Sequence, residues 1–231
     1  AAAARARVIG LAAAAAGVVL CAGGIVLQGA EAGGTSFTAA LDASVVHDVL
    51  ATDFGAAWAV RLIAFLALAL LLWLAPTGRR PVIALAALAS AALVATPALA
   101  GHANATGPRV LMLLADAAHV AAMSAWVGGV AFLVAVVPTA TRQLEPGERT
   151  RLLAAVVCRF STVALAAVAV LVATGVLQSI AHLRSFGDLL SAGYGRAILI
   201  KSVLVLLLVA AGAMNRRGTV PRLRRTAAAG E

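Results

Sequence analysis

Long apolar runs separated by short polar segments make up most of this chain. Alanine, leucine and valine fill the runs, without the period-two alternation that is typical of barrel strands. Each run has about the ~20 residues that an α-helix needs to cross the hydrocarbon core of a bilayer. The pattern predicts an all-α, polytopic membrane helix bundle of about six transmembrane helices, over residues 8–28, 54–75, 81–100, 109–137, 151–181 and 194–214.

Charged residues lie mainly between the apolar runs, and their sign alternates from one side to the other. Arginines precede the first run and follow the second, fourth and sixth, whereas segment 29–53 has only carboxylates. The positive-inside rule then predicts that both termini are cytoplasmic. Only 12% of the residues are charged and 63% are hydrophobic, against roughly 25% charged in soluble domains. The net charge of +9 therefore reflects topology, and we expect no nucleic-acid partner.

The first apolar run could be a signal peptide instead of a transmembrane span, because basic residues precede it. A signal h-region has about 7–15 residues, and this run is longer, so we interpret it as a true span. A weak internal repeat supports that interpretation. An aromatic-Gly pair followed by a cation, Arg61 in the second run, recurs with Lys201 in the sixth. Parallel repeats of this kind occur in transporters, although apolar helices can also resemble one another by chance.

The fourth run carries residue types that a lipid-facing helix does not need. Met112, Asp116, His119 and Met123 follow one another at spacings of 4, 3 and 4 residues, so they share one face of a helix. Imidazole and thioether ligands suit soft or borderline metals and point to copper, Cu(I) in preference to Cu(II). The alternative for both methionines is ordinary packing, since methionine often fills gaps between apolar helices.

Two further histidines fall on the predicted outer side. His102 lies in the turn before the fourth run, and His182 closes the fifth. We expect them to capture copper ahead of Asp116 and His119, and the alternative for His102 is an exposed loop residue without a ligand role. Two histidines could also hold a b-type haem, which is a second use of the same residues.

Three charges fall at a similar depth inside the apolar runs. Arg61, Asp116 and Lys201 each lie about 10 Å below the outer end of their helix, at 1.5 Å per residue. A charge in hydrocarbon costs ~2.5–3.5 kcal/mol on insertion scales. We therefore predict that they face the bundle interior along the transport path, with Asp116 paired to a cation. The alternative for Arg61 and Lys201 is that their long side chains reach back to the outer surface.

Catalytic signatures are missing from the sequence. It contains no GxSxG, HExxH, Walker or dinucleotide-binding motif, and these are the short patterns that mark hydrolases, metalloproteases and nucleotide enzymes. We predict that the protein is not an enzyme and has no catalytic residues.

Several short motifs together give the chain a family resemblance. The motifs are Gly101-His102-Ala103, Asp116-x-x-His119, Trp126-x-Gly128-Gly129, Tyr194-Gly195-Arg196 with Lys201, and Asn215-Arg216-Arg217. In their order and spacing, residues 101–217 resemble the CopD copper-resistance family, the YcnJ type included. Phe54-Gly55 with Trp58 and Arg61 resembles the more N-terminal region of the same family.

The resemblance implies a multi-pass protein of the bacterial cytoplasmic (inner) membrane that transports copper, usually inward. It implies a periplasmic CopC-like copper carrier as a partner, and His102, Asp116 and His119 as the residues to watch. An alternative is an assembly factor that hands copper to an oxidase without transporting it.

We expect one transmembrane domain over residues 1–231. It would comprise three N-terminal spans in 1–100, a CopD-like core in 101–217 and a basic cytoplasmic tail in 218–231. Members of the family commonly have further spans, so we expect this chain to be part of a longer protein. A CtaG-like domain is a candidate neighbour in the same chain.

Overall fold

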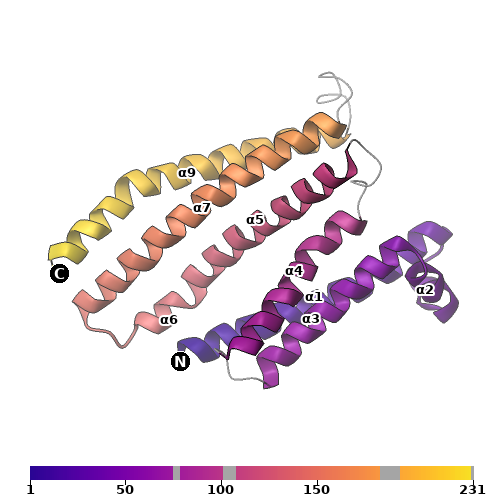
Figure 1. Ribbon diagram of the computed structural model, residues 1–231, viewed down its shortest axis with the longest axis horizontal. Helices are drawn as coiled ribbons and strands as arrows, with labels where there is room; N and C mark the ends of the chain where they lie inside the picture. Colours follow the sequence, from indigo (N-terminus) through magenta and orange to yellow (C-terminus); the bar gives the residue numbers. More distant parts are fainter. Residues whose placement is uncertain (75–78, 101–107, 183–192, 230–231) are drawn as a thin grey trace. The chain divides into compact units, whose positions relative to one another are not determined.

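The computed structural model describes residues 1–74, 79–100, 108–182 and 193–229, and all regular elements in these ranges are helices. Six helical segments are long and apolar enough to cross a membrane, which confirms the predicted all-α class and the number of spans (Figure 1). The long helices are α1 (Ala2–Gly33), α3 (Asp53–Leu74), α4 (Arg80–Ala100), α5 (Arg109–Ala135), α7 (Pro146–His182) and α9 (Gly193–Ala229).

Short helices occupy part of segment 29–53, where the hydrophobic pattern predicted no element. They are η1 (Ala39–Leu41) and α2 (Ala43–Leu50). Asp42 caps α2, because its Oδ1 accepts hydrogen bonds from the Ser44 hydroxyl at 2.7 Å and the Ser44 backbone N–H at 2.9 Å. These two bonds lower the pKa of the Asp42 carboxyl below its ordinary value. A third short helix, α6 (Val137–Thr141), follows α5 and has a proline in its first turn.

The turn between α2 and α3 explains the aromatic-Gly motif. The Thr52 hydroxyl donates to the Val49 carbonyl at 2.6 Å and accepts from the Gly55 N–H at 3.1 Å, which caps the start of α3. A Cβ on Gly55 would overlap the backbone of Val49 and Leu50. Glycine is therefore required here because another segment of backbone lies against it.

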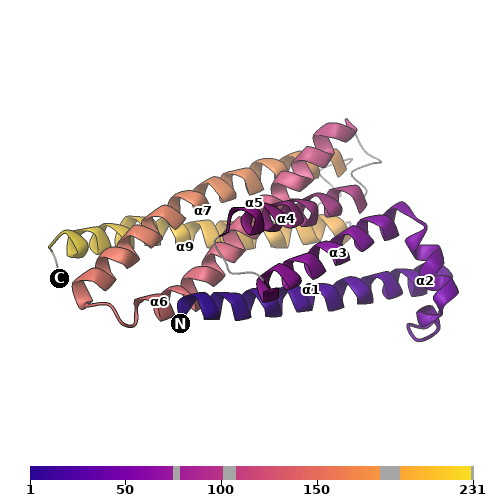
Figure 2. The same ribbon diagram turned by 60° about the horizontal axis from the view of Figure 1, so that its bottom comes forward.

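Packing divides the chain into two compact units. The N-terminal unit is Ala3–Ala117, and the C-terminal unit is Ala118–Glu231 together with Ala1–Ala2. In the N-terminal unit, α3 packs along α4 and contacts α2. Helix α1 runs antiparallel to α3, and α2 lies at the end of this pair (Figure 2). The predicted subdivision after residue 100 follows sequence motifs. The boundary between the compact units lies at Ala117–Ala118 and follows packing, so the two boundaries describe different properties.

Glycines on α1 make room for large side chains of α3. A Cβ on Gly24 would overlap the ring of Trp58, and a Cβ on Gly17 would overlap the ring of Phe65. Gly10 stands in the same relation to Leu72, with a closest approach of 2.9 Å. The glycines recur every seven residues, two helical turns, and their partners recur every seven in the opposite direction. This pattern is the register of an antiparallel helix pair.

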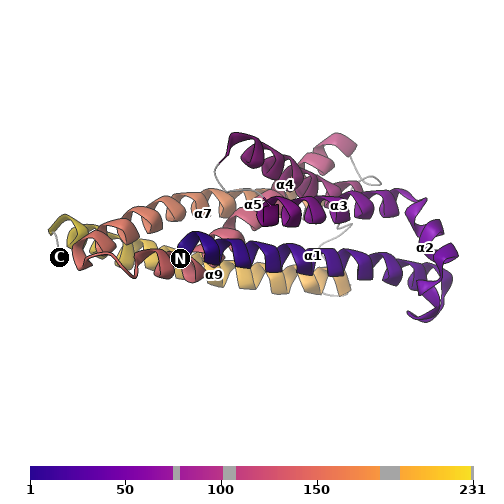
Figure 3. The ribbon, with the colours of Figure 1, turned by 90° about the horizontal axis from the view of Figure 1, so that it is seen from below.

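The C-terminal unit is built on the antiparallel pair of α5 and α7. Ala122 of α5 forms a small core with Ala167 and Leu171 of α7, and Trp126 packs against it. Further along, a Cβ on Gly129 would overlap the Phe160 ring, whereas one on Gly128 would meet nothing within 4 Å. Gly129 is thus a packing residue, as predicted for the Gly128-Gly129 pair, and Gly128 makes no comparable contact. Helix α9 packs against α7 and runs beside it (Figures 1 and 3).

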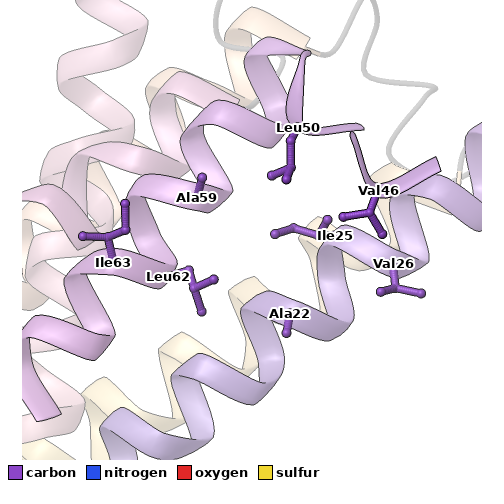
Figure 4. Close-up of a pocket in the computed structure, with 8 residues that line it drawn as sticks. All are labelled: Ala22, Ile25, Val26, Val46, Leu50, Ala59, Leu62 and Ile63. Atoms are coloured by element: carbon purple, nitrogen blue, oxygen red, sulfur yellow. The ribbon is translucent and has the colours of Figure 1, made fainter. Parts of the chain in front are cut away.

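An apolar cavity of about 410 Å³ lies within the N-terminal unit, between α1, α2 and α3 (Figure 4). No polar side chain lines it. The lining residues are Ala22, Ile25, Val26, Val46, Leu50, Ala59, Leu62 and Ile63. With nothing to bind or orient an ion, this cavity takes no part in the polar chemistry described next.

Candidate functional site

His119 of α5 forms the polar contact between α5 and α7. Its Nδ1 lies 2.8 Å from the hydroxyl oxygen of Thr174 on α7. That hydroxyl donates its proton to the Val170 carbonyl at 2.7 Å, the usual back-bond of a helical threonine. Because a hydroxyl has a single proton, it can only accept from His119. His119 therefore donates from Nδ1 to Thr174, and this bond orients its ring against α7.

A polar stripe on α7 continues from Thr174 towards the end of the helix. Gln178 follows one turn later, half-buried and with its Nε2 shielded from solvent. His182, one further turn along, is the last residue of α7, and its side chain lies outside the described residues. The spacing of four residues places Gln178 on the same face of α7 as Thr174, the face that meets His119.

The predicted stripe of α5 differs in burial from one residue to the next. Met112 is buried, with 4% of its surface exposed, whereas Met123 is 49% exposed. Asp116 is half-buried on the same continuous helix. Met123 directly follows Ala122, so it points about 100° away from the face that packs on α7. The four residues share a helix face, as the spacing predicted, but only part of that face is covered.

The described residues do not gather a complete ligand set. Among residues 1–74, 79–100, 108–182 and 193–229, no three histidine, cysteine, aspartate or glutamate side chains lie close enough to hold a metal ion. His102 is in 101–107, outside the described ranges. His47, on α2, is exposed and forms a pair with Asp48 at 3.7 Å. The assembly of His102, Asp116, His119 and His182 into one site thus stays a prediction.

Arg61 of α3 is held inside the N-terminal unit by two neutral contacts. Its Nε donates to the Thr96 hydroxyl of α4 at 3.1 Å, and its guanidinium carbon lies 4.7 Å from the centre of the Trp58 ring. Thr96 is 2% exposed, and its own proton goes to the Leu93 carbonyl at 3.2 Å. Pro97 has no N–H to offer that carbonyl, so the hydroxyl takes the place of the missing helix bond.

The two predicted intramembrane cations have different surroundings. Arg61 is tied into its unit through Thr96, and its place along a transport path stays a prediction. Lys201, its counterpart in the predicted repeat, is exposed on α9. Among the described residues of the N-terminal unit, the Arg61 Nε bond goes to a hydroxyl, and the pairing of Asp116 with a cation stays a prediction.

Sequence reasoning missed the two threonines that hold these side chains. Thr96 has a local signal, because a threonine directly before a proline inside an apolar run can replace the hydrogen bond that proline removes. Thr174 has a weaker signal, which is its position one turn before Gln178 and two before His182 on an otherwise apolar helix. Neither signal predicts which side chain the threonine binds, since that depends on how two helices align.

The described residues contain six helices that are suited to span a membrane, and some of these helices carry a histidine, a carboxylate or an arginine. These features are typical of a multi-pass membrane protein. Comparison with known families identifies it further. Residues 1–110 match "Copper resistance protein D-like, N-terminal domain", and residues 154–231 match "Copper resistance protein D". The chain belongs to the copper resistance protein D (CopD) family, as the sequence motifs predicted.

The matched ranges divide the site residues. Arg61 and Thr96 fall in the N-terminal match, and Thr174, His182 and Lys201 fall in the second. The stripe of α5, including His119, lies in 111–153, between the two. The predicted CopD-like range was 101–217. The family match to copper resistance protein D begins later, at residue 154, and ends later, at residue 231.

A curated relative carries the name copper transport protein CutJ, from Bacillus subtilis (strain 168). It is 34% identical over 123 residues, which are 53% of this chain and 22% of the relative. The chain thus spans about a fifth of that relative's length. No solved structure matches the chain significantly.

Proposed function

We propose that this chain is part of a protein that transports copper across the bacterial cytoplasmic membrane, inward from the periplasmic side. Three observations support the proposal. The chain belongs to a copper-resistance family, a relative is named a copper transport protein, and six helices are suited to span a bilayer. The arginine pattern of the loops supports cytoplasmic termini. The carboxylate-rich segment 29–53 would then face the copper supply, in a position to meet a CopC-like carrier.

The observation that carries the proposal is the contact between His119 and Thr174, which orients the imidazole inside the membrane spans. The His119 Nδ1 lies 2.8 Å from the Thr174 hydroxyl, which holds the imidazole between α5 and α7 about 15 Å along α5 from Arg109. A ligand whose second nitrogen is oriented in this way is the usual arrangement for metal-binding histidines. Asp116, one turn earlier, supplies a negative charge that offsets the cost of a cation in a low-dielectric region.

In this proposal copper is the substrate. His102 and His182 take it up at the outer face, and Asp116 and His119 accept it within the membrane. Met112 and Met123 supply thioether sulfur, which favours Cu(I) over Cu(II). Arg61 and Lys201 are cations of the transport path and would repel copper wherever Asp116 does not compensate for them.

Copper accumulation in cells tests this mechanism. We expect His119→Ala and Asp116→Asn each to reduce the uptake rate at least tenfold at limiting copper, because each removes one of two inner ligands. Met214→Leu, at an exposed position on α9, is the control that should leave uptake unchanged at equal protein levels in the membrane. Wild-type uptake by both site variants would disprove the mechanism.

Flux into proteoliposomes separates transport from delivery to an oxidase. Copper that appears inside vesicles containing the protein supports transport. Stoichiometric copper binding without flux would instead support a protein that hands copper to a partner at the outer face. A Soret band in the purified protein would show that the histidines hold haem, and would overturn the copper assignment.

A further inference from the structure

Arg61 has a positive charge that binds no copper in the proposed function and needs a counter-charge of its own. A guanidinium stays protonated under all ordinary conditions, and Arg61 lies eight residues into α3, well within a membrane span. Its Nε–H is bonded to a neutral hydroxyl, and its face lies over a neutral ring. Among the described residues no carboxylate pairs with it. The charge is therefore surrounded by dipoles and by the Cys21 thiol of α1, which interacts with it electrostatically, and no carboxylate among the described residues neutralises it.

The contacts fix which part of the guanidinium remains for a ligand. Thr96 takes the Nε edge, and Trp58 covers one face. The terminal nitrogens Nη1 and Nη2 have four N–H donors, and no residue in the described part of the chain accepts from them. The side chain is half-buried rather than sealed. The Nη edge is thus a positioned fork of donors, the geometry with which arginine binds anions.

Thr96 and Trp58 are themselves held in place, so the fork is rigid. The Thr96 proton is committed to the Leu93 carbonyl that Pro97 leaves without an N–H, which directs the hydroxyl lone pair at Arg61. Trp58 is stacked on Phe54 at 5.2 Å, and its ring fills the space beside Gly24. Such preorganisation reduces the entropy that a ligand would otherwise lose in ordering the side chain.

We propose that the Nη edge of Arg61 is a binding site for a small inorganic anion, such as a halide, inside the N-terminal unit. A halide there would neutralise the intramembrane charge by accepting two N–H bonds that converge on it. The known neighbours of the guanidinium are an aromatic ring, a hydroxyl that is already bonded and the Cys21 thiol. None of them is a second cation, so one guanidinium charge balances one monovalent anion. The phosphate of a lipid headgroup is the other source of the same chemistry.

Trp58 reports on this site directly, because its ring adjoins the guanidinium. The protein has three tryptophans, so Trp73→Phe with Trp126→Phe leaves Trp58 as the single fluorophore. In maltoside micelles, which contain no phosphate, iodide is titrated against gluconate at constant ionic strength. We expect quenching that saturates, and a half-saturation concentration at least tenfold higher in Arg61→Gln. Arg7→Gln, an arginine bonded to the Trp73 carbonyl at the other end of α3, should match the parent protein.

Competition makes the test independent of whether a variant folds. Chloride added to the parent protein should raise the half-saturation for iodide in proportion to its concentration. Phosphatidylglycerol added to the micelles identifies the source: loss of saturable quenching means that a lipid phosphate occupies the same edge, and unchanged quenching means a solution anion. Quenching that is linear in iodide, insensitive to chloride and identical in Arg61→Gln would overturn the proposal.

Discussion

Two hydroxyl groups decide how the polar side chains inside the spans behave. Thr174 and Thr96 each give their proton to a carbonyl of their own helix, so each presents a lone pair to a neighbouring helix. One lone pair orients the ring of His119, and the other orients Arg61. At the scale of single residues, therefore, the chemistry of the charged and imidazole groups is controlled by neutral neighbours.

The control by Thr174 can be measured through copper affinity. Thr174→Val removes the acceptor of the His119 Nδ1 proton while keeping the shape of the side chain. Loss of such an outer partner typically reduces metal affinity or activity about 10- to 100-fold, and we expect a loss of this size in the copper concentration that half-saturates uptake. Thr174→Ser should restore the parent value.

A matched control lies on the same helix. Thr162 makes the same kind of back-bond, to the Cys158 carbonyl at 3.4 Å, on an exposed position of α7. Thr162→Val should leave copper uptake unaffected. Equal half-saturation in Thr174→Val and the parent protein would show that the hydroxyl does not act on His119.

At the scale of elements, glycines determine which helices can pack and in what register. On α1 they receive Leu72, Phe65 and Trp58 of α3, and on α5 a single glycine receives Phe160 of α7. In a bilayer, where lipid tails are as apolar as the side chains, such shape complementarity is a principal source of helix association. The aromatic rings thereby fix how far each helix slides along its partner.

Neighbouring glycines provide an internal comparison for this effect. A methyl group on Gly24 would overlap the Trp58 ring, whereas one on Gly23 would meet nothing within 4 Å. We expect Gly24→Ala to lower the free energy of unfolding in micelles by about 1–3 kcal/mol, the usual cost of overpacking. Gly23→Ala should be neutral or stabilising by up to about 1 kcal/mol, from helix propensity.

The pair on α5 repeats the comparison in the other unit. Gly129→Ala should destabilise through the Phe160 ring, and Gly128→Ala should not. Denaturant unfolding followed by circular dichroism measures all four variants. Equal effects of the two alanines within a pair would show that the rings are not seated in the glycine positions.

At the scale of the whole molecule, the hydrophobic pattern predicted the number, type and approximate bounds of the spans. This succeeds because insertion into a bilayer depends on the summed hydropathy of a contiguous segment, a property of the sequence itself. Helices α7 and α9 extend beyond the predicted spans, because each continues as a helix into polar residues that follow or precede the apolar run. Helix α2 was missed because a helix of eight residues is too short to give a clear periodic signal.

The site was less predictable than the fold, for a physical reason. Spacing placed Asp116 and His119 on one face of a helix, and the depth of Arg61 indicated an interior position. The partners Thr174 and Thr96 depend on the register between two helices, which is set by packing shapes rather than by any local pattern. The ion pair of Asp116 stays a prediction from charge alone, whereas the bond from Arg61 to the Thr96 hydroxyl beside Pro97 is seen only in the structure.

Orientation in the membrane is a property of the entire chain, and we expect segment 29–53 outside and the 142–151 segment inside. In a background of Cys21→Ala and Cys158→Ala, a membrane-impermeant maleimide should label Ser36→Cys in intact spheroplasts. It should label Gln143→Cys only after permeabilisation. Both positions are exposed. The reverse labelling pattern would invert the topology and with it the proposed direction of copper entry.

The proline break in α4 has an electrical consequence. Arg61 donates to Thr96, and Thr96 donates onward to the Leu93 carbonyl, so the two bond dipoles point in the same direction. Aligned bonds polarise one another, by about 10–30% per bond in condensed-phase estimates. Electron density is thereby displaced from the Leu93 oxygen towards the guanidinium, and part of the positive charge is spread into the backbone of α4. An unbroken helix would already have used that oxygen in its own ladder.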